Sequence, residues 1–293
     1  MLRMMVVTLV VVVLAGLRIP AVQAEDKQVL FLSKSQAFEH GPVARAEGRP
    51  SLCDVVLGKL VQEIGGTFHS TKDASLINAE ELDKYDLVVL YTQGDLTQPS
   101  VDGAAPMGAN GVAELIEWVE NGGGLVGFHA AADTFRVGEA PHAFITLLGA
   151  EFLTHGAQFK GTIQVVDPKH PTMANVPDGW TLNEEWYLFR RFDKDTMHVL
   201  ALLEPGAERA KQEAYNIPAY PIIWCSKQGK GRVYYSALGH REDVWTNPQF
   251  QQTVIDAMEW AMGKGRTRAQ PNFDKVVPTA KPEEEAAAGS RAK

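Results

Sequence analysis

His129 is the residue with the clearest chemical potential in this chain, because it stands at a tight turn directly after an apolar run. The turn, Gly127-Phe-His-Ala-Ala131, has the small residues of a nucleophile elbow, in which one side chain projects above a sheet. In α/β enzymes with this elbow the projecting residue is Ser or Cys, because it must form a covalent intermediate. An imidazole suits proton transfer or metal ligation better. We therefore predict that His129 is a site residue; the alternative is a hydrogen-bonded histidine that only shapes the loop.

Other histidines also follow expected strands. His240 comes after the apolar run at 232–237, and His40 comes after the first apolar run of the mature chain. Ligands of parallel α/β sheets gather at the carboxyl ends of the strands, so both residues are candidates for the same site as His129. His155 follows a shorter apolar stretch, where a structural role in a loop competes with a functional one.

Acidic and aromatic candidates lie close together in the second half. Glu184 and Glu185 are consecutive, so on a strand they would face opposite ways, and we expect one to face the site and the other solvent. Trp186 and Tyr187 follow directly and could stack on a sugar, although core packing is the usual role of such side chains. Asp133 closes the elbow turn and could cap a helix or orient a histidine.

Strands and helices that alternate in the first half would position these side chains. Apolar runs of strand length occur at 29–33, 67–71, 86–92 and 125–128, and helical spacing occurs at 55–64 and 112–119. Such alternation implies right-handed parallel crossovers, so we predict a parallel α/β sheet. The second half instead offers strand candidates at 162–166, 198–203, 221–224 and 232–237 with little helix between them. These predict a β-rich extension and a returning sheet edge, closed by a helix at 248–262.

The two ends differ from the middle of the chain. A basic start, an apolar run at 4–17 and small residues at 21–24 form the three-part pattern of a secretory signal peptide. We expect residues 1–24 to be this signal and the protein to be exported, to the periplasm or the extracellular space. The apolar run is short for a membrane span, and an uncleaved anchor is the alternative. Residues 264–293 hold few large apolar side chains and are expected to form a disordered tail.

Charge and cysteine content exclude some functions. The net charge of −8 and the pI near 5.5 argue against a nucleic-acid partner, which would require a basic face. Cys53 and Cys225 could pair in an exported chain, or both could be buried thiols, because one opens an amphipathic helix and the other lies in a strand. Neither lies at an elbow, which disfavours a cysteine enzyme. The oligomeric state stays open, with a homo-oligomer among the options.

Five segments in the same order identify a family resemblance over about residues 27–263. They are Gly123-Gly-Leu-Val-Gly-Phe-His-Ala-Ala-Ala-Asp-Thr134, Gly149-Ala-Glu-Phe-Leu-Thr-His155, Asp167-Pro-Lys-His-Pro171, Asn183-Glu-Glu-Trp-Tyr187 and Ala237-Leu-Gly-His240. With them the chain resembles the ThuA-like (trehalose-utilisation) proteins, a branch of the class I glutamine-amidotransferase-like fold. The variant Gly239-His-Arg-Glu-Asp-Val-Trp-Thr-Asn-Pro248 is similar to the secreted members.

This resemblance implies a single domain at 25–263, with a flavodoxin-like parallel sheet and the β-rich extension. In amidotransferases of this fold the elbow is Gly-x-Cys-x-Gly, and a His-x-Glu pair completes the triad. The chain keeps such a pair in His240-Arg-Glu242, which could also be a chance match, but has His129 in place of the cysteine. Glutamine hydrolysis through a thioester is therefore excluded. The family's acidic-Glu-x-Tyr motif favours Glu185 over Glu184 as the acid of the site.

These arguments give one expected site. The residues expected to be catalytic are His129, His240 and Glu185, and those expected to contact substrate are His40, Asp133, Trp186 and Tyr187. A second hypothesis is a divalent, zinc-like metal held by His129, His155, Glu185 and His240. The metal rests on residue type and strand-end position alone, since no short His-x-x-x-His pair occurs.

Two classes of function remain. The first is an enzyme, a sugar isomerase, lyase or hydrolase, that acts on a disaccharide or oxidised (keto) sugar by His/Glu acid–base or metal-assisted chemistry. The second is a non-catalytic sugar-binding or accessory protein that kept the fold. Loss of the nucleophile favours the second class. Several titrating groups at strand ends favour the first, because a site that only binds has little need of them.

Cleavage of the signal is testable directly. We expect mature protein from the native host to begin near Glu25, because small residues at 21–24 suit the signal peptidase. N-terminal sequencing of the purified protein checks this, and an intact Met1 in a membrane fraction would contradict it.

Overall fold

The computed structural model describes residues 26–277, except 47, 102 and 137. The expected signal peptide and residues 278–293 of the expected tail lie outside this range. Among the described residues, no helix is both long and apolar enough to cross a membrane.

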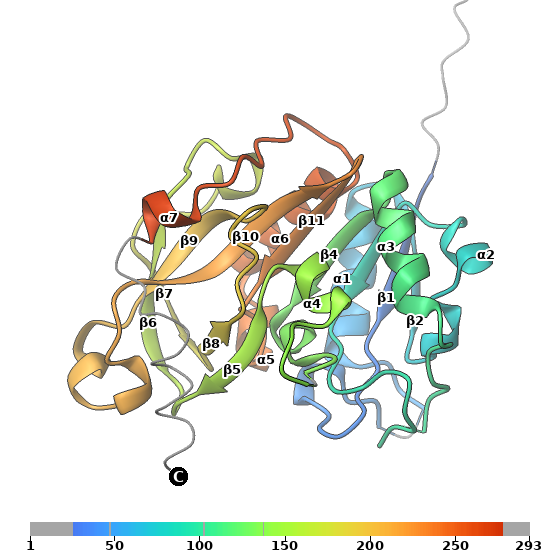
Figure 1. Ribbon diagram of the computed structural model, residues 1–293, viewed down its shortest axis with the longest axis horizontal. Helices are drawn as coiled ribbons and strands as arrows, with labels where there is room; N and C mark the ends of the chain where they lie inside the picture. Colours follow the sequence, from blue (N-terminus) through green and yellow to red (C-terminus); the bar gives the residue numbers. More distant parts are fainter. Residues whose placement is uncertain (1–25, 47, 102, 137, 278–293) are drawn as a thin grey trace, which may run out of the picture.

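A nine-stranded sheet forms the centre of the described structure, in the order β2-β1-β3-β4-β11-β10-β9-β6-β7 (Figure 1). The strands are β1 Lys27–Leu32, β2 Gly66–Thr71, β3 Leu87–Leu90, β4 Gly124–Phe128, β6 Phe159–Val165, β7 Trp180–Glu184, β9 His198–Glu204, β10 Tyr220–Gln228 and β11 Gly231–Ser236. The run from β2 to β11 is parallel, and the strands from β10 to β7 pair antiparallel. Two further strands, β5 Glu151–His155 and β8 Tyr187–Arg190, pair with each other in a separate small sheet. The predicted parallel sheet with a β-rich extension is thus confirmed.

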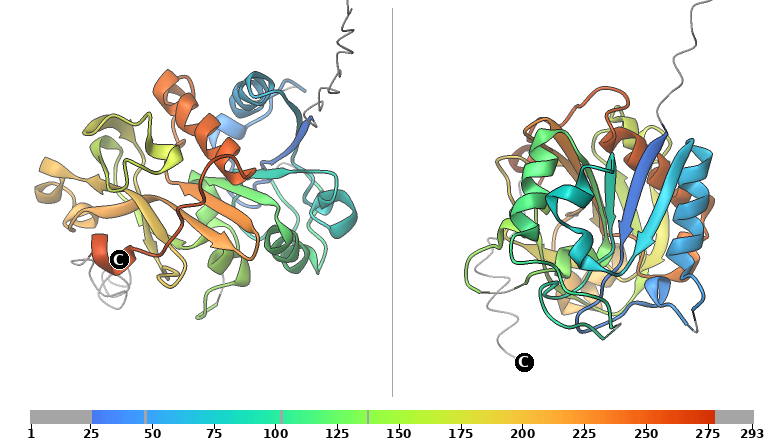
Figure 2. Two further views of the ribbon diagram at one scale, coloured as in Figure 1. Left: turned by 90° about the horizontal axis from the view of Figure 1, so that it is seen from above. Right: turned by 90° about the vertical axis from the view of Figure 1, so that its right-hand side faces the viewer.

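Helices cover both faces of the parallel half, which explains why its central strands are apolar throughout. The helices are α1 Leu52–Glu63, α2 Ala79–Leu82, α3 Gly111–Asn121, α4 Ala143–Leu148, α5 Glu242–Trp245, α6 Pro248–Ala261 and α7 Phe273–Val276. In Figure 2, α1 and α6 lie on one side of the sheet and α3 on the other, beside α2 and α4. Every residue of β3 and β4 is buried, as expected for strands covered on both faces.

The strand expected at 232–237 lies inside the sheet: β11 is between β4 and β10, and β7 forms the edge on the side of the extension. β11 pairs parallel with β4, and Ser236 lies opposite Phe128 in the register. Because both strands end at the same level, the segments that follow them, with His129 and His240, emerge side by side. Hydrophobic periodicity reports that a strand is buried but not which strands are its neighbours.

The expected disordered tail also differs from the structure in its first part. Residues 264–277 pack on the extension, where Phe273 and Val277 are buried. The side chain of Asn272 accepts a hydrogen bond from Val199 N at 2.7 Å and donates one to Val199 O at 3.0 Å. This side-chain amide therefore satisfies the backbone N–H and C=O of Val199 in β9, as a neighbouring strand would. Composition missed the segment because it is held by only two large buried apolar side chains together with specific polar contacts, such as that of Arg268 with Asp167.

The two cysteines are free and buried. Cys53 lies in α1 and Cys225 in β10, so the two-thiol alternative holds in this structure. Burial raises the pKa of both thiols well above the ordinary value. Neither is therefore an activated nucleophile.

Polar contacts at the start of α1 fix that helix against the sheet. Ser51 and Asp54 form a capping box: Asp54 N donates to the Ser51 hydroxyl at 3.1 Å, and Ser51 N donates to the carboxylate at 2.8 Å. Arg45 holds the same carboxylate through two nitrogens at 2.8 and 3.0 Å, and Ser70 of β2 donates to it as well. Burial would raise the pKa of Asp54, but these hydrogen bonds outweigh it and lower the pKa.

Replacing Asp54 by Ala should therefore destabilise the protein by about 1–2 kcal/mol at neutral pH, the usual cost of a lost cap. Since the folded-state pKa lies below 3.8, the contribution is complete above that pH and is lost as the pH falls through the folded value. Urea denaturation should show a difference in the free energy of unfolding between wild type and variant, and this difference should become smaller at acid pH. Asp178→Ala, at an exposed position, is the control; an equal loss in both variants would contradict the assignment.

Candidate functional site

The candidate site lies at the carboxyl ends of the parallel strands. His129 follows β4 directly, His240 lies four residues beyond the end of β11, and His40 precedes a short 3-10 helix, Gly41–Val43, in the segment after β1. In Figure 1 this end of the strands points to the lower edge of the molecule, where α5, β5 and β8 gather. The sheet topology therefore brings together three segments that are far apart in the sequence.

The turn at His129 has the strained backbone of an elbow. Its φ angle is +38°, which costs a non-glycine residue about 1–3 kcal/mol. Hydrogen bonds from β11 and beyond hold this conformation: the Tyr235 hydroxyl donates to His129 O at 2.7 Å, and His129 Nδ1 lies 3.0 Å from Ala237 O. The turn packs closely at Gly127, where a Cβ would lie 2.8 Å from the Leu148 side chain and 3.3 Å from Ala131 Cβ. The elbow shape inferred from the sequence is present.

The turn before His240 is held equally firmly. Gly239 has a φ of +114°, a conformation that favours glycine. Its carbonyl accepts hydrogen bonds from the Tyr91 hydroxyl at 3.0 Å and from Trp245 Nε1 at 2.8 Å. Its N–H donates to Glu184 Oε2 at 2.8 Å. Three partners from three elements thus fix the peptide that carries His240.

Glu184 was expected to be one of a pair facing site and solvent, and this was wrong. It is fully buried at the end of β7, and its Oε1 accepts a hydrogen bond from Glu185 N at 2.8 Å. Alternation failed because Glu185 lies beyond the end of the strand, in the connection to β8. Burial raises the pKa of Glu184 to about 7, although the N–H groups of Gly239 and Glu185 oppose the rise. Glu184 therefore supports both the acid of the site and the turn before His240.

A buried group of three imidazoles and one carboxylate forms the centre of the site. We call it the imidazole–carboxylate cluster; its members are His40, His129, Glu185 and His240, each with one N or O atom within 4.8 Å of the others. Oε2 of Glu185 lies 3.0 Å from His240 Nδ1 and 3.4 Å from His129 Nε2. His129 Nε2 and His240 Nδ1 are 3.2 Å apart. The expected meeting of His129, His240 and Glu185 is thus seen in the structure.

His40 completes the cluster from the segment after β1, at the same end of the sheet. Its ring centroid lies 5.2 Å from that of His129 and 5.3 Å from that of His240, nearly perpendicular to both. Nε2 lies 3.4 Å from the Tyr187 hydroxyl, whereas Nδ1 is buried and has no hydrogen-bond partner among the described residues. His40 was expected to contact substrate; it is 4% exposed and faces the other histidines instead.

Burial and neighbouring charges give the members of the cluster different charge states. Burial lowers the pKa of His40 to about 2, and the neighbouring His129 and His240 act in the same direction. Burial also lowers the pKa of His129, against the effect of the neighbouring Glu185 carboxylate. For Glu185, burial would raise the pKa, but the neighbouring imidazoles of His129 and His240 lower it well below its usual range. At neutral pH, His40 and His129 are therefore neutral and Glu185 is ionised.

His155 does not belong to the cluster, contrary to the metal set expected from the sequence. It lies at the end of β5 with its side chain 42% exposed, and its Nδ1 lies 2.9 Å from Gly156 O and 3.4 Å from Glu185 Oε1. It therefore contacts the oxygen of Glu185 that faces away from His129 and His240. His155 borders the site on the solvent side.

Two other expected contacts take structural positions. Trp186 is fully buried; its Nε1 donates to Phe159 O at 3.0 Å, so it cannot stack on a ligand. Tyr187 reaches the site, but its ring packs between His129, at 3.8 Å, and Phe152, at 4.1 Å between centroids. It covers the inner face of the cluster.

Asp133 lies beside the site rather than in it. Its Oδ2 accepts a hydrogen bond from Gln93 Nε2 at 2.9 Å, and its Oδ1 pairs with Arg136 at 3.0 Å. Burial raises the pKa of its carboxyl. Oδ2 therefore ties the elbow turn to the loop after β3, and Oδ1 binds within the elbow's own segment; a contact with substrate stays a prediction.

The His-x-Glu pair of the amidotransferase triad is not assembled. Glu242 begins α5 and is exposed, and none of the hydrogen bonds or ion pairs of the described residues joins it to His240. The acid that pairs with His240 is Glu185, from a different part of the chain. The short sequence match was therefore coincidental as a catalytic pair.

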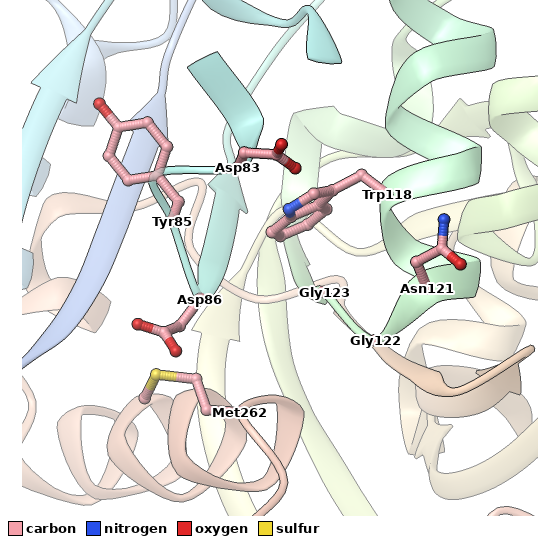
Figure 3. Close-up of a pocket in the computed structure, with 8 residues that line it drawn as sticks. All are labelled: Asp83, Tyr85, Asp86, Trp118, Asn121, Gly122, Gly123 and Met262. Carbon is pink, nitrogen blue, oxygen red and sulfur yellow. The ribbon is translucent and has the colours of Figure 1, made fainter. Parts of the chain in front are cut away.

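A cavity elsewhere on the molecule does not compete with this site. It has a volume of about 280 Å³ and lies at the amino ends of β3 and β4, at the other end of the sheet (Figure 3). The Asp86 carboxylate in its lining accepts hydrogen bonds from Lys27 Nζ at 2.7 Å and from Gln28 N at 2.9 Å. Its Trp118 packs on Gly123, where a Cβ would lie 2.4 Å from the indole. These side chains have structural partners.

Two supporting residues were missed in the sequence. The family motif favoured Glu185 as the acid of the site, but the buried supporting role of Glu184 was not foreseen, because it depends on where the strand ends. Tyr91 ends the apolar run of β3 and donates to Gly239 O. A tyrosine at the end of an otherwise apolar strand was the available signal for it.

Comparisons with known proteins agree with this architecture. The family model for ThuA, described as trehalose utilisation, matches residues 28–261. A putative ThuA-like protein from Parabacteroides merdae is similar in structure, with a TM-score of 0.62 and 18% identity over 89% of this chain and 99% of that one. One from Bacteroides uniformis has a TM-score of 0.58 and 20% identity over 87% and 99%. No protein of curated function matches the sequence.

The support that Glu184 provides can be measured as stability. Glu184→Gln keeps one acceptor and turns an NH₂ group toward the second amide, so one buried N–H loses its partner at a cost of about 1–3 kcal/mol. Urea denaturation at neutral pH should show this loss, whereas Glu117→Gln, exposed on α3, should leave the midpoint unchanged. Equal midpoints for both variants would show that the carboxylate does not hold the two amides.

Proposed function

The chain belongs to the ThuA family (trehalose utilisation), and we propose that it is an enzyme acting on a disaccharide or oxidised (keto) sugar by acid–base chemistry. The family supports a role associated with carbohydrate use. The observation that carries the enzymatic part is the contact of the Glu185 carboxylate with two imidazoles, His129 and His240, at the carboxyl ends of parallel strands.

Exposure divides the roles within this site. The His129 side chain is fully buried, whereas that of Glu185 is 12% and that of His240 21% exposed. A sugar can therefore reach Glu185 and His240, and His155 at the rim, but not His129. We assign proton transfer to the accessible groups, and to His129 the positioning of Glu185. The sequence had suggested that His129 itself was catalytic.

Sugars with a keto group suit these residues. A carbonyl acidifies the neighbouring C–H, so a carboxylate or neutral imidazole can remove that proton and leave an enediolate. Return of a proton to the adjacent carbon completes an isomerisation, and loss of a β-substituent completes an elimination. Both routes need a base and an acid within hydrogen-bond reach of adjacent atoms, which Glu185, His240 and His155 can supply. Neither route needs a covalent nucleophile.

The alternative of a non-catalytic sugar-binding protein is less well supported by the geometry. Ligand sites commonly present aromatic faces and neutral polar groups. Here Trp186 is buried in the core and both faces of Tyr187 are packed, so the groups left at the mouth are one carboxylate and two imidazoles. Perturbed pKa values such as those of Glu184 and Glu185 are typical of catalytic sites.

The test is exchange of a carbon-bound proton. Wild-type protein incubated in D₂O with a panel of disaccharides and their keto derivatives should introduce deuterium next to a carbonyl, detected by NMR. Glu185→Gln and His240→Ala should lower the rate by at least about 10²-fold, the usual contribution of a general acid or base. Their melting temperatures should stay within a few degrees of wild type.

His69→Ala provides a matched control, because His69 is an exposed histidine of β2 far along the sheet from the site. It should retain full exchange. Full activity in both site variants would refute the assigned roles. Binding of a panel sugar without any exchange or new product would instead favour the sugar-binding alternative.

A further inference from the structure

We propose that the imidazole–carboxylate cluster binds one divalent transition-metal ion of zinc-like preference, with a coordination position left open toward solvent. The inference concerns the same site as the proposed function. It rests on that function only for the use of the open position, because metal binding is measurable without any sugar.

Distances within the cluster fit a common metal centre. Zinc binds imidazole nitrogen and carboxylate oxygen at about 2.0–2.2 Å, so its neighbouring ligand atoms lie about 3.0–3.4 Å apart. The separations among Glu185 Oε2, His129 Nε2 and His240 Nδ1 are 3.0, 3.2 and 3.4 Å. These three atoms therefore form one face of a coordination polyhedron.

The tautomer of His129 directs a lone pair into the cluster. Its Nδ1 faces the carbonyl oxygen of Ala237 at 3.0 Å, which can only accept, so Nδ1 carries the hydrogen. In the neutral ring Nε2 then presents a lone pair to the middle of the cluster, between Glu185 Oε2 at 3.4 Å and His240 Nδ1 at 3.2 Å. A metal ion bound there would accept this lone pair. A backbone carbonyl that holds the far nitrogen of the ring is also the usual outer support of a metal-binding histidine.

His40 supplies the fourth ligand and a second, independent observation. It is 4% exposed, and one of its ring nitrogens lies within 4.8 Å of each of the other ligand atoms. Its buried Nδ1 has no hydrogen-bond partner among the described residues. A buried imidazole nitrogen without a partner is costly, and ligation removes that cost. Burial of His40 and His129 has no evident use for a group that must touch a sugar, whereas it suits ligands.

The types of donor atom indicate which metals the cluster would prefer, and the packing of Tyr187 indicates which side of the site is accessible. Three imidazoles with one carboxylate suit zinc and neighbouring first-row ions rather than calcium or magnesium, which prefer oxygen. Tyr187 closes the inner side, so the open position faces the side of Glu185 and His240. His155 lies there, next to the second oxygen of Glu185, 3.4 Å away. A carbonyl or hydroxyl oxygen of the sugar would occupy this position, within reach of the proton-transferring groups.

Metal binding is tested on the full mature chain without any sugar. Protein stripped with a chelator and then incubated with Zn²⁺ or Co²⁺ alone should retain about one equivalent per chain after desalting, measured by elemental analysis. Co²⁺ should give visible absorption of a low-symmetry site, and Zn²⁺ should raise the melting temperature. Less than a tenth of an equivalent, with no absorption band and no thermal shift, would overturn the proposal.

Two histidine variants distinguish the ligand set from its surroundings. His40→Ala should weaken Zn²⁺ binding by more than the roughly 10–100-fold that loss of an outer partner costs, whereas His155→Ala should stay within that range and still bind one equivalent. His40→Gln replaces the first variant should it fail to fold. Loss of metal in His155→Ala but not in either His40 variant would refute this assignment. One bound equivalent without deuterium exchange on any sugar would overturn the proposed function and leave the metal site intact.

Discussion

Two backbone amides donate hydrogen bonds to one buried carboxylate, that of Glu184, and these bonds hold the candidate site together. Glu184 accepts hydrogen bonds from Gly239 N and Glu185 N, both at 2.8 Å. The first amide belongs to the turn after β11 in the parallel sheet, and the second to the connection between β7 and β8 in the extension. A shift of either half of the molecule relative to the other would therefore alter the distance between Glu185 and His240. Because Glu184 is fully buried, water cannot replace it as a partner for these amides.

A second constraint is the strained elbow at His129, which is held by its neighbours rather than by its own preference. Its left-handed backbone persists because Tyr235 binds its carbonyl and Ala237 its ring. The same contacts that maintain the strain also fix the ring orientation and the tautomer. An elbow of this shape in other enzymes projects a nucleophile to the substrate. Here it places an imidazole beneath a carboxylate, so the geometry of the elbow is kept with a histidine in the position of the nucleophile.

Burial creates two layers within the site. His40 and His129 lie inside, under Tyr187, and Glu185, His240 and His155 lie progressively closer to solvent. The inner layer has fixed orientations and neutral rings, and the outer layer has groups that a ligand can reach. This arrangement unites the two proposals for the site: the inner nitrogens, with Glu185 Oε2 and His240 Nδ1, suit a metal ion, and the remaining atoms of the outer groups suit proton transfer. Glu185 belongs to both layers, since one of its oxygens faces each.

The sequence alone determined the class of fold and which kinds of residue follow the strand ends. Apolar runs and glycine stops located the parallel strands, because burial on both faces requires such runs, and small residues around His129 identified the elbow, because bulkier side chains would not fit. Local patterns did not show that β11 enters the middle of the sheet, that Glu184 turns inward, or that His40 rather than His155 joins the cluster. Only the tertiary structure decided these points, because they depend on which strand ends become neighbours. Contacts between residues a hundred or more positions apart leave no period in the sequence.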